Sequence, residues 1–243
     1  MGIRLPVESL VDVGKGKPMI LLHGYSHNIN CWESVIDEFS STHRVIIPRT
    51  PLHSHFESSE RLMDIVEYLY VFIKTYGLDE VILLGSSFGG NIALFFAWKY
   101  PRLVDKLIIA GNSGFLEINH NDCCSKHLTI DSYEACFPEN QLAPDVRGDV
   151  MLVTTRGLTY SGKCLDQSSV LPEVLSTISI PVLLIWGLED TITPPLIALA
   201  THHYLPLSDL IFLDGCGHVP MKEQPILFNK HVRNFLNDSV QIN

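Results

Sequence analysis

The feature that most constrains the fold of this chain is the pentapeptide Gly85-Ser86-Ser87-Phe88-Gly89, which matches the pattern G-x-S-x-G. It stands directly after the apolar run Val81–Leu84 and before a helical pattern that covers residues 91–100. A chain that passes from strand to helix so quickly must turn sharply, and Gly85 and Gly89 lack side chains that would hold the two elements apart. The pattern predicts a serine hydroxyl exposed at a helix N-terminus, where the helix dipole favours negative charge.

Two adjacent serines compete for the central position of this pattern. The spacing selects Ser87, because a register centred on Ser86 would leave Phe88 where the second glycine is needed. A serine hydroxyl is a weak nucleophile at neutral pH, so a catalytic serine requires a general base nearby. If Ser87 is a nucleophile, the rest of the chain must therefore supply a base and the groups that support it.

Short apolar runs alternate with longer helical patterns along most of the chain. The runs are nearly continuous, which is typical of strands buried on both faces of a parallel sheet. The expected strands are 19–22, 44–47, 81–84, 106–110, 182–186 and 210–213, and the expected helices are 32–39, 58–76, 91–100, 196–204 and 223–236. This alternation predicts a doubly wound α/β sheet.

One stretch interrupts the alternation. Residues 115 to about 176 contain no clear buried strand, only scattered Cys, His, Pro and Gly with short amphipathic pieces. We interpret residues 1–114 and 177–243 as one α/β core and residues 115–176 as an insertion. Because ligands of open α/β sheets bind at the carboxyl ends of the strands, we expect this insertion to form a lid there.

His218 is the preferred general base and Asp190 the preferred acid that orients it. His218 lies just past the last expected strand, in a loop defined by Gly215, Gly217 and Pro220. Asp190 follows the strand at 182–186, and a carboxylate there would fix the tautomer of the imidazole. Glu189 is the near competitor, and the distance from the strand end favours Asp190.

An oxyanion intermediate requires hydrogen-bond donors. One expected donor is the backbone N–H of Phe88, the residue after the serine. The other is the backbone N–H of Tyr25, which follows the first clear strand in the loop His23-Gly24-Tyr25. Gly24 permits a sharp bend there, and we expect His23 to brace the loop.

Taken together, these motifs resemble the α/β-hydrolase superfamily over nearly the whole chain. The resemblance rests on His23-Gly24-Tyr25 with Trp32, the serine pentapeptide, the acid loop Trp186–Asp190 and the histidine loop Gly217-His218. It implies a mostly parallel central sheet flanked by helices, with a small and mainly helical lid. It also implies a serine hydrolase similar to carboxylesterases, with the residue order Ser, Asp, His that is expected for this fold.

The leading functional hypothesis is hydrolysis of a small carboxylic ester through an acyl-enzyme, with Ser87, Asp190 and His218 as the triad. A thioesterase, or a carbon–carbon bond hydrolase acting on ring-fission products, would use the same residues. From a different class, some members of this fold sense small molecules and turn over slowly, and turnover number would distinguish such a receptor from an enzyme. The motifs do not separate these alternatives.

Charge and sequence patterns limit the kinds of binding partner, cofactor and location that we expect. The formal net charge is −10 and no cluster of Lys and Arg overrides it, so we do not expect nucleic-acid binding. No apolar run is long enough for a signal peptide or a membrane span, which predicts a cytoplasmic protein. His53 and His55 share a loop without a carboxylate at ligand spacing, so neither a metal nor another cofactor is expected. The six cysteines are expected to be free thiols. The expected partner is a small-molecule acyl substrate, and the sequence leaves the oligomeric state open.

Overall fold

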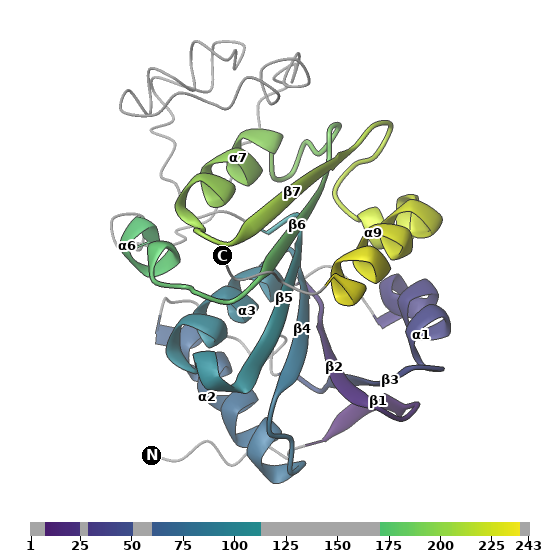
Figure 1. Cartoon of the computed structure of the whole chain (residues 1–243), viewed down its shortest axis with the longest axis vertical. Helices are drawn as coiled ribbons and strands as arrows, with labels where there is room; N and C mark the ends of the chain where they lie inside the picture. The colour runs from purple at the N-terminus through teal and green to yellow at the C-terminus, as the bar shows by residue number, and fades with distance from the viewer. Residues whose placement is uncertain (1–7, 25–28, 51–59, 113–170, 239–243) are drawn as a thin grey trace.

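The computed structural model describes residues 8–24, 29–50, 60–112 and 171–238. Within these residues, seven strands form one sheet in the order β1-β3-β2-β4-β5-β6-β7 (Figure 1). Each neighbouring pair is parallel except β1 and β3, which run antiparallel. The strands are Ser9–Val13 (β1), Lys17–Leu22 (β2), His43–Pro48 (β3), Val81–Ser86 (β4), Val104–Ala110 (β5), Val182–Gly187 (β6) and Ser208–Leu213 (β7).

Helices cover both faces of the sheet, as the doubly wound prediction requires (Figure 1). One face packs against α2, α3, α6 and α7, and the other against α1, α8 and α9. The α-helices are Glu33–Phe39 (α1), Glu60–Thr75 (α2), Phe88–Lys99 (α3), Leu171–Ser176 (α6), Pro195–Tyr204 (α7), Pro220–Glu223 (α8) and Pro225–Asn237 (α9). Short 3₁₀ turns cover Ile29–Trp32 and Pro101–Leu103.

The structure confirms all six expected strands and corrects the ends of some helices. The helix expected from residue 91 begins at Phe88, immediately after the serine. The helix expected at 223–236 corresponds to α9, which begins at Pro225, because proline lacks a backbone N–H and favours the first turn of a helix; Glu223 instead ends the separate helix α8. The edge strand β1 was not predicted, since most of its residues are exposed and it has no buried apolar run.

Helix α3 is buried on all sides. Its residues from Phe88 to Ala97 are all buried, between the sheet and the neighbouring helices α2 and α6. A helix that is apolar all round belongs in a protein interior. The N-terminus of α3 is therefore held firmly against the carboxyl ends of the central strands.

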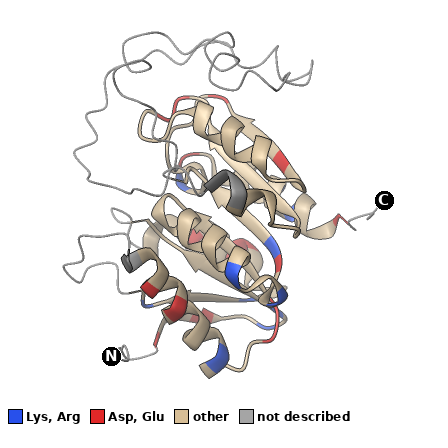
Figure 2. Ribbon diagram, turned by 90° about the vertical axis from the view of Figure 1, so that its left-hand side faces the viewer, with Lys and Arg blue, Asp and Glu red and all other residues tan. Residues whose placement is uncertain are grey.

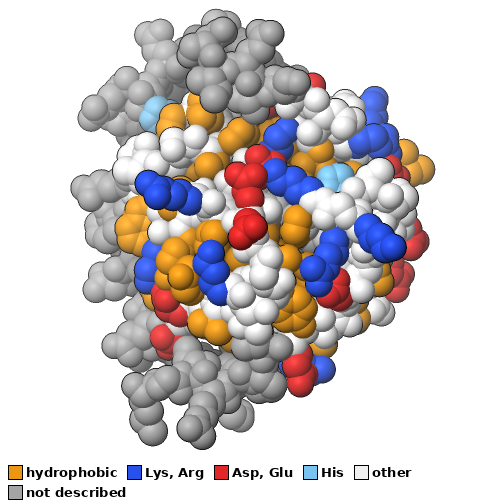
Figure 3. All heavy atoms as spheres, turned by 60° about the horizontal axis from the view of Figure 1, so that its bottom comes forward, with side chains coloured by type: hydrophobic (Ala, Val, Ile, Leu, Met, Phe, Trp, Pro, Cys, Tyr) orange, Lys and Arg blue, Asp and Glu red, His pale blue; other side chains and the backbone are white. Residues whose placement is uncertain are grey.

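Many charged residues lie on the helices and near the ends of strands (Figure 2). At the amino ends of the strands, Lys17 forms ion pairs with Glu80 and Asp105, which ties β2 to the starts of β4 and β5. Figure 3 shows this end of the molecule, where acidic and basic side chains are interspersed. The opposite end of the sheet carries the predicted functional residues.

Most of the predicted insertion, residues 115–170, lies outside the described residues, as do His53 and His55. Its last six residues form α6, which packs against α3 and α7. Among the described residues, none of the helices is both long and apolar enough to cross a membrane.

Candidate active site

The predicted functional residues follow the carboxyl ends of neighbouring parallel strands. Ser87 follows β4, Asp190 follows β6, and His218 follows β7. His23 follows β2, and β2 pairs in parallel with β4, the strand that precedes Ser87. Because parallel strands end at the same edge of a sheet, residues that are far apart in sequence are gathered there.

Ser87 occupies a backbone conformation that residues with a side chain rarely adopt. Its φ is 53° and its ψ is −124°, and it is the only non-glycine residue with positive φ in the described parts of the chain. Such conformations cost about 1–3 kcal/mol and persist only where the surroundings enforce them. The Ser87 N–H donates to the carbonyl oxygen of Ala110, at 2.9 Å, which fixes the turn to the end of β5.

The two glycines of the pentapeptide lie where the backbone of other residues approaches closely. A Cβ at Gly85 would lie 2.5 Å from the carbonyl oxygen of Gly89, across the strand–helix turn. A Cβ at Gly89 would lie 2.0 Å from the carbonyl oxygen of Leu22 and 2.9 Å from that of His23. The turn that carries Ser87 is therefore packed directly on the end of β2.

The loop after β2 accordingly lies beside the serine turn. His23 is buried, and its Nδ1 donates to the carbonyl oxygen of Gly24 at 2.9 Å. Phe88 is the first residue of α3, so its amide belongs to the first helical turn next to Ser87. Tyr25, the other expected oxyanion donor, lies outside the described residues.

Asp190 and His218 form a buried hydrogen-bonded pair. The distance between Asp190 Oδ2 and His218 Nδ1 is 2.8 Å, and Asp190 is fully buried. The other carboxylate oxygen, Oδ1, accepts hydrogen bonds from the backbone N–H groups of Ile192 at 2.9 Å and Thr193 at 2.8 Å. A buried carboxylate held in this way is suited to orient an imidazole and to stabilise its protonated form.

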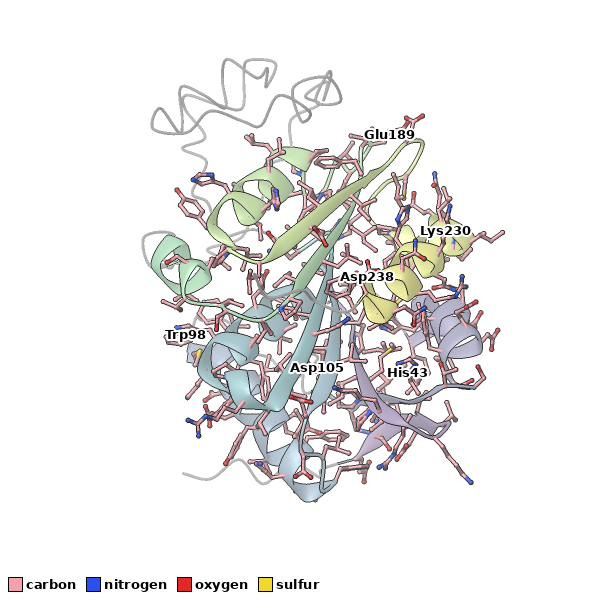
Figure 4. All side chains as sticks on the ribbon, in the orientation of Figure 1. His43, Trp98, Asp105, Glu189, Lys230 and Asp238 are labelled. Carbon is pink, nitrogen blue, oxygen red and sulfur yellow. The ribbon has the colours of Figure 1, made fainter. Side chains whose placement is uncertain are left out.

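Glu189, the competing acid, does not take part in this pair. Its side chain is exposed, and Figure 4 shows it pointing outward at the upper end of the sheet. Its backbone N–H donates to the carbonyl oxygen of Cys216, at 2.9 Å, so its main chain links the acid loop to the histidine loop. The structure thus brings Asp190, and not Glu189, to His218.

The end of β5 touches both the serine turn and the acid–base pair. Ala110 accepts the hydrogen bond from Ser87, and the next residue, Gly111, has a φ of 54°. A Cβ at Gly111 would lie 3.2 Å from His218 Nδ1 and 3.3 Å from Asp190 Oδ2. This residue was missed in the sequence, because a single glycine after a strand is also typical of an ordinary turn.

Gly187, the last residue of β6, marks where the acid loop crosses the histidine loop. A Cβ there would lie 2.1 Å from the carbonyl oxygen of Cys216 and 2.2 Å from that of Gly217. Only a glycine allows the two main chains to approach this closely. The acid–base pair is therefore brought together by contact between the backbones as well as by its own hydrogen bond.

Two further residues at the pair were also missed. Thr193 contacts both members through its hydroxyl. Glu223, on α8, accepts hydrogen bonds from the backbone on either side of His218. Neither has a sequence signal of its own: a threonine near a proline pair suggests a loop, and a charged residue near the start of a helix suggests a solvated surface.

The thiol of Cys216 lies next to this site but is not in its reactive, deprotonated form near neutral pH. Burial, together with the carboxylates of Glu223, Asp190 and Glu189, raises the pKa of Cys216 to about 12. The thiol therefore stays protonated near neutral pH and cannot compete with a serine as nucleophile. No group of three or more His, Cys, Asp or Glu side chains within the described ranges gathers to hold a metal ion.

Comparison with known proteins agrees with this architecture. A family model described as the alpha/beta hydrolase fold matches residues 17–122. An alpha/beta hydrolase enzyme from a metagenome of lagoon sediments at Mar Chica, Morocco, has a similar structure, with a TM-score of 0.68 and 30% sequence identity. The similarity covers 93% of each chain.

Curated relatives are more distant and differ in chemistry. A 2-hydroxy-6-oxononadienedioate/2-hydroxy-6-oxononatrienedioate hydrolase of Burkholderia vietnamiensis is 27% identical, over 93% of this chain and 89% of its own length. A pimeloyl-acyl-carrier-protein methyl ester esterase of Nitrosomonas europaea is 23% identical, over 88% of this chain and 94% of its own length.

Proposed function

Because this chain belongs to the α/β-hydrolase superfamily, we propose that it is a serine hydrolase that cleaves a small carboxylic ester through an acyl-enzyme. The observation that carries the proposal is the arrangement around the end of β5. Ala110 holds the strained turn of Ser87, and Gly111 packs against Asp190 and His218. A nucleophile candidate and an aligned acid–base pair therefore lie on either side of the same strand end.

In the proposed reaction, Ser87 Oγ attacks the ester carbonyl while His218 takes the hydroxyl proton. The tetrahedral intermediate collapses, the bond to the alcohol oxygen breaks, and His218 returns its proton to the departing alcohol. A water molecule then attacks the acyl-enzyme while His218 takes its proton. The bond between the acyl carbon and Ser87 Oγ breaks, His218 returns the proton to Oγ, and the carboxylic acid is released. No cofactor takes part in this sequence.

Asp190 has two tasks in this scheme. By accepting from Nδ1 it keeps that nitrogen protonated, which leaves Nε2 free to act as the base. Its negative charge also stabilises the imidazolium that forms when His218 takes a proton. The two backbone N–H groups on Oδ1 hold the carboxylate so that Oδ2 stays directed at the ring.

The amides of Phe88 and Tyr25 are the proposed donors to the oxyanion. Phe88 supports this role by its place in the first turn of α3, where the helix dipole favours negative charge. The close approach of Gly89 to the backbone of Leu22 and His23 supports the participation of Tyr25, because these two residues lead into the segment that contains it.

Carbon–carbon bond cleavage is a second candidate on the same residues. It is supported by the 27% identity to a hydrolase whose name describes an oxononadienedioate substrate, over most of both chains. The esterase relative is 23% identical, so sequence similarity alone does not decide between the two reactions. We place the ester first because a serine triad of this kind needs no further group to cleave one.

The test is hydrolysis of p-nitrophenyl esters of increasing acyl length by the wild type, Ser87→Ala and Ser86→Ala. Ser86 is the matched control, because it is the adjacent serine and is fully buried. We expect turnover in the wild type and in Ser86→Ala, and none in Ser87→Ala. Full activity of Ser87→Ala would refute the assignment. If the wild type cleaves no ester but cleaves a ring-fission dienoate in a Ser87-dependent way, the second candidate replaces the first.

A further inference from the structure

The hydroxyl of Thr193 lies between the two members of the acid–base pair. Its Oγ1 is 2.7 Å from Asp190 Oδ2 and 3.1 Å from His218 Nδ1, while those two atoms are 2.8 Å apart. The three polar atoms therefore form a closed triangle. Thr193 is 1% exposed, so water does not compete for these contacts.

The role of the Thr193 hydroxyl follows from which of the three atoms donate and which accept hydrogen bonds. The carboxylate oxygen Asp190 Oδ2 can only accept, so it accepts hydrogen bonds from the Thr193 hydroxyl, over the shorter distance, and from the Nδ1–H of His218. If Nδ1 carried no proton, its lone pair would face the carboxylate oxygen at 2.8 Å, which is unfavourable. The Nδ1–H then has two oxygens within reach, with Thr193 Oγ1 as the second acceptor.

We propose that Thr193 is a positioning residue that keeps the Asp190 carboxylate and the His218 ring aligned through its hydroxyl. This inference rests on the proposed function, since the aligned pair matters for catalysis only if His218 is the base. The Thr193 hydroxyl touches neither substrate nor reacting atoms. It acts by fixing Oδ2 from one side and by limiting rotation of the ring from the other.

The backbone of Thr193 is held independently of its hydroxyl. Its N–H donates to Asp190 Oδ1, and its carbonyl oxygen accepts from Trp186 Nε1 at 2.7 Å. Among the described residues, the hydroxyl makes one further polar contact, a long one of 3.4 Å to the carbonyl oxygen of Gly111. Replacing the hydroxyl by a methyl group therefore leaves the loop anchored, which separates a positioning role from a structural one.

The variants are Thr193→Val, which has nearly the same shape without the hydroxyl, and Thr193→Ser, which retains the hydroxyl. We expect Thr193→Val to lower kcat by about tenfold, the effect of losing one hydrogen bond to a charged group, with KM little changed. Thr193→Ser should restore most of the loss. The thermal midpoint of each variant checks that both are folded.

The pH profile provides a readout that a structural role would not change. Without the hydroxyl, the charge on Oδ2 is less stabilised by hydrogen bonding, so the imidazolium form of His218 becomes relatively more stable. The acidic limb of kcat/KM should therefore move to higher pH in Thr193→Val and not in Thr193→Ser. The other carboxylates near the histidine loop, Glu223 and Glu189, are unchanged in both variants, as is the neighbouring thiol of Cys216.

A measurement independent of turnover completes the test. In protein labelled with ¹⁵N-histidine, the Nδ1–H resonance of His218, assigned by its loss in His218→Ala, should exchange about tenfold faster with solvent in Thr193→Val than in the wild type. Unchanged exchange together with an unchanged kcat and pH profile would refute the positioning role while the proposed function stands. If the wild type is no more active than Ser87→Ala on any substrate, the proposed function fails, and the exchange rates alone decide whether Thr193 aligns the pair.

Discussion

The carboxylate of Glu223 brackets His218 by binding the backbone on both sides of it. Oε2 accepts from the N–H of Gly217 at 2.7 Å, and Oε1 accepts from the N–H of Val219 at 2.8 Å. Both partners are backbone groups on either side of His218, so these contacts fix the direction in which the His218 side chain projects from the main chain. Helix α8 thereby acts as a support for the histidine loop.

We expect Glu223→Ala to lower ester turnover by about tenfold, because small displacements of a catalytic base are costly. Glu223→Gln keeps one side-chain oxygen as an acceptor and should lose less. Steady-state rates of both variants against the wild type provide the measurement. An alanine variant with wild-type kcat would show that the loop is held without this carboxylate.

Asp190→Asn should lower turnover by orders of magnitude. The amide group can present a donor to Nδ1, which favours the wrong imidazole tautomer, and the equivalent change in the serine-protease triad costs about 10⁴ in kcat. Glu189→Gln is the matched control, because Glu189 is the adjacent and exposed acid. The assignment fails if the control loses activity and Asp190→Asn does not.

Ser87→Gly should be more stable than Ser87→Ala, although we expect both to be inactive. Alanine keeps the side-chain strain at a φ of 53°, whereas glycine adopts this conformation without it. The strain relieved exceeds the entropic cost of glycine in the unfolded chain, so we expect a gain of about 1 kcal/mol in the free energy of unfolding. Urea titration of the two variants measures it, and equal midpoints would argue against strain at the turn.

Lys106 should matter for stability rather than for catalysis. Its ammonium group donates to the carbonyl oxygens of Phe235 at 2.7 Å, Leu236 at 3.1 Å and Asp238 at 3.0 Å, which joins β5 to the C-terminal end of α9. Lys106→Met should lower the free energy of unfolding by about 1–2 kcal/mol, because these helix-terminal carbonyls lose their charged donor.

The control for Lys106 is Lys230→Met, which removes an exposed lysine of α9 that Figure 4 shows at the outer side of the helix. Urea unfolding should show little change for Lys230→Met. A loss of equal size in both variants would indicate an effect of charge in general rather than of the contact with the helix end.

Cys31 and Cys216 should resist alkylation while the protein is folded. Both are buried, and both are free, as expected for the six cysteines of which these two lie in the described residues; burial raises the pKa of each thiol to about 12. At pH 8 the reactive thiolate is therefore much rarer than in an exposed cysteine, whose pKa is about 8.5. Iodoacetamide treatment followed by peptide mass spectrometry should find both unmodified in native protein and modified in urea.

The sequence predicted the parallel core because its central strands are buried on both faces. Runs such as 81–84 and 182–186 consist entirely of large apolar residues, a pattern that only a buried element explains. Strand β1 lacks this signal because it pairs at an edge and its residues alternate only weakly between partly buried and exposed. Its attachment depends on long-range contacts, such as the two hydrogen bonds from Arg44 to Asp12.

The residues of the candidate site also fall into those that the sequence indicated and those that it did not. The geometry agrees with Asp190 and His218 as a pair, and their loops were recognisable because glycines and prolines follow strands there. Thr193 and Glu223 were not recognisable, because their roles arise from hydrogen bonds that form only when the acid loop, the histidine loop and α8 meet. The roles of Ser87, Asp190, His218, Phe88 and Tyr25 in catalysis stay predictions.

Gly187 shows that the site also depends on a residue that contributes no side chain to it. Any larger side chain there would meet the carbonyl oxygens of Cys216 and Gly217 and force the two loops apart. A related protein could therefore keep its serine, aspartate and histidine and still be inactive through one substitution at this position. Recognising such inactive relatives requires inspection of the residue at the end of β6 as well as of the triad itself.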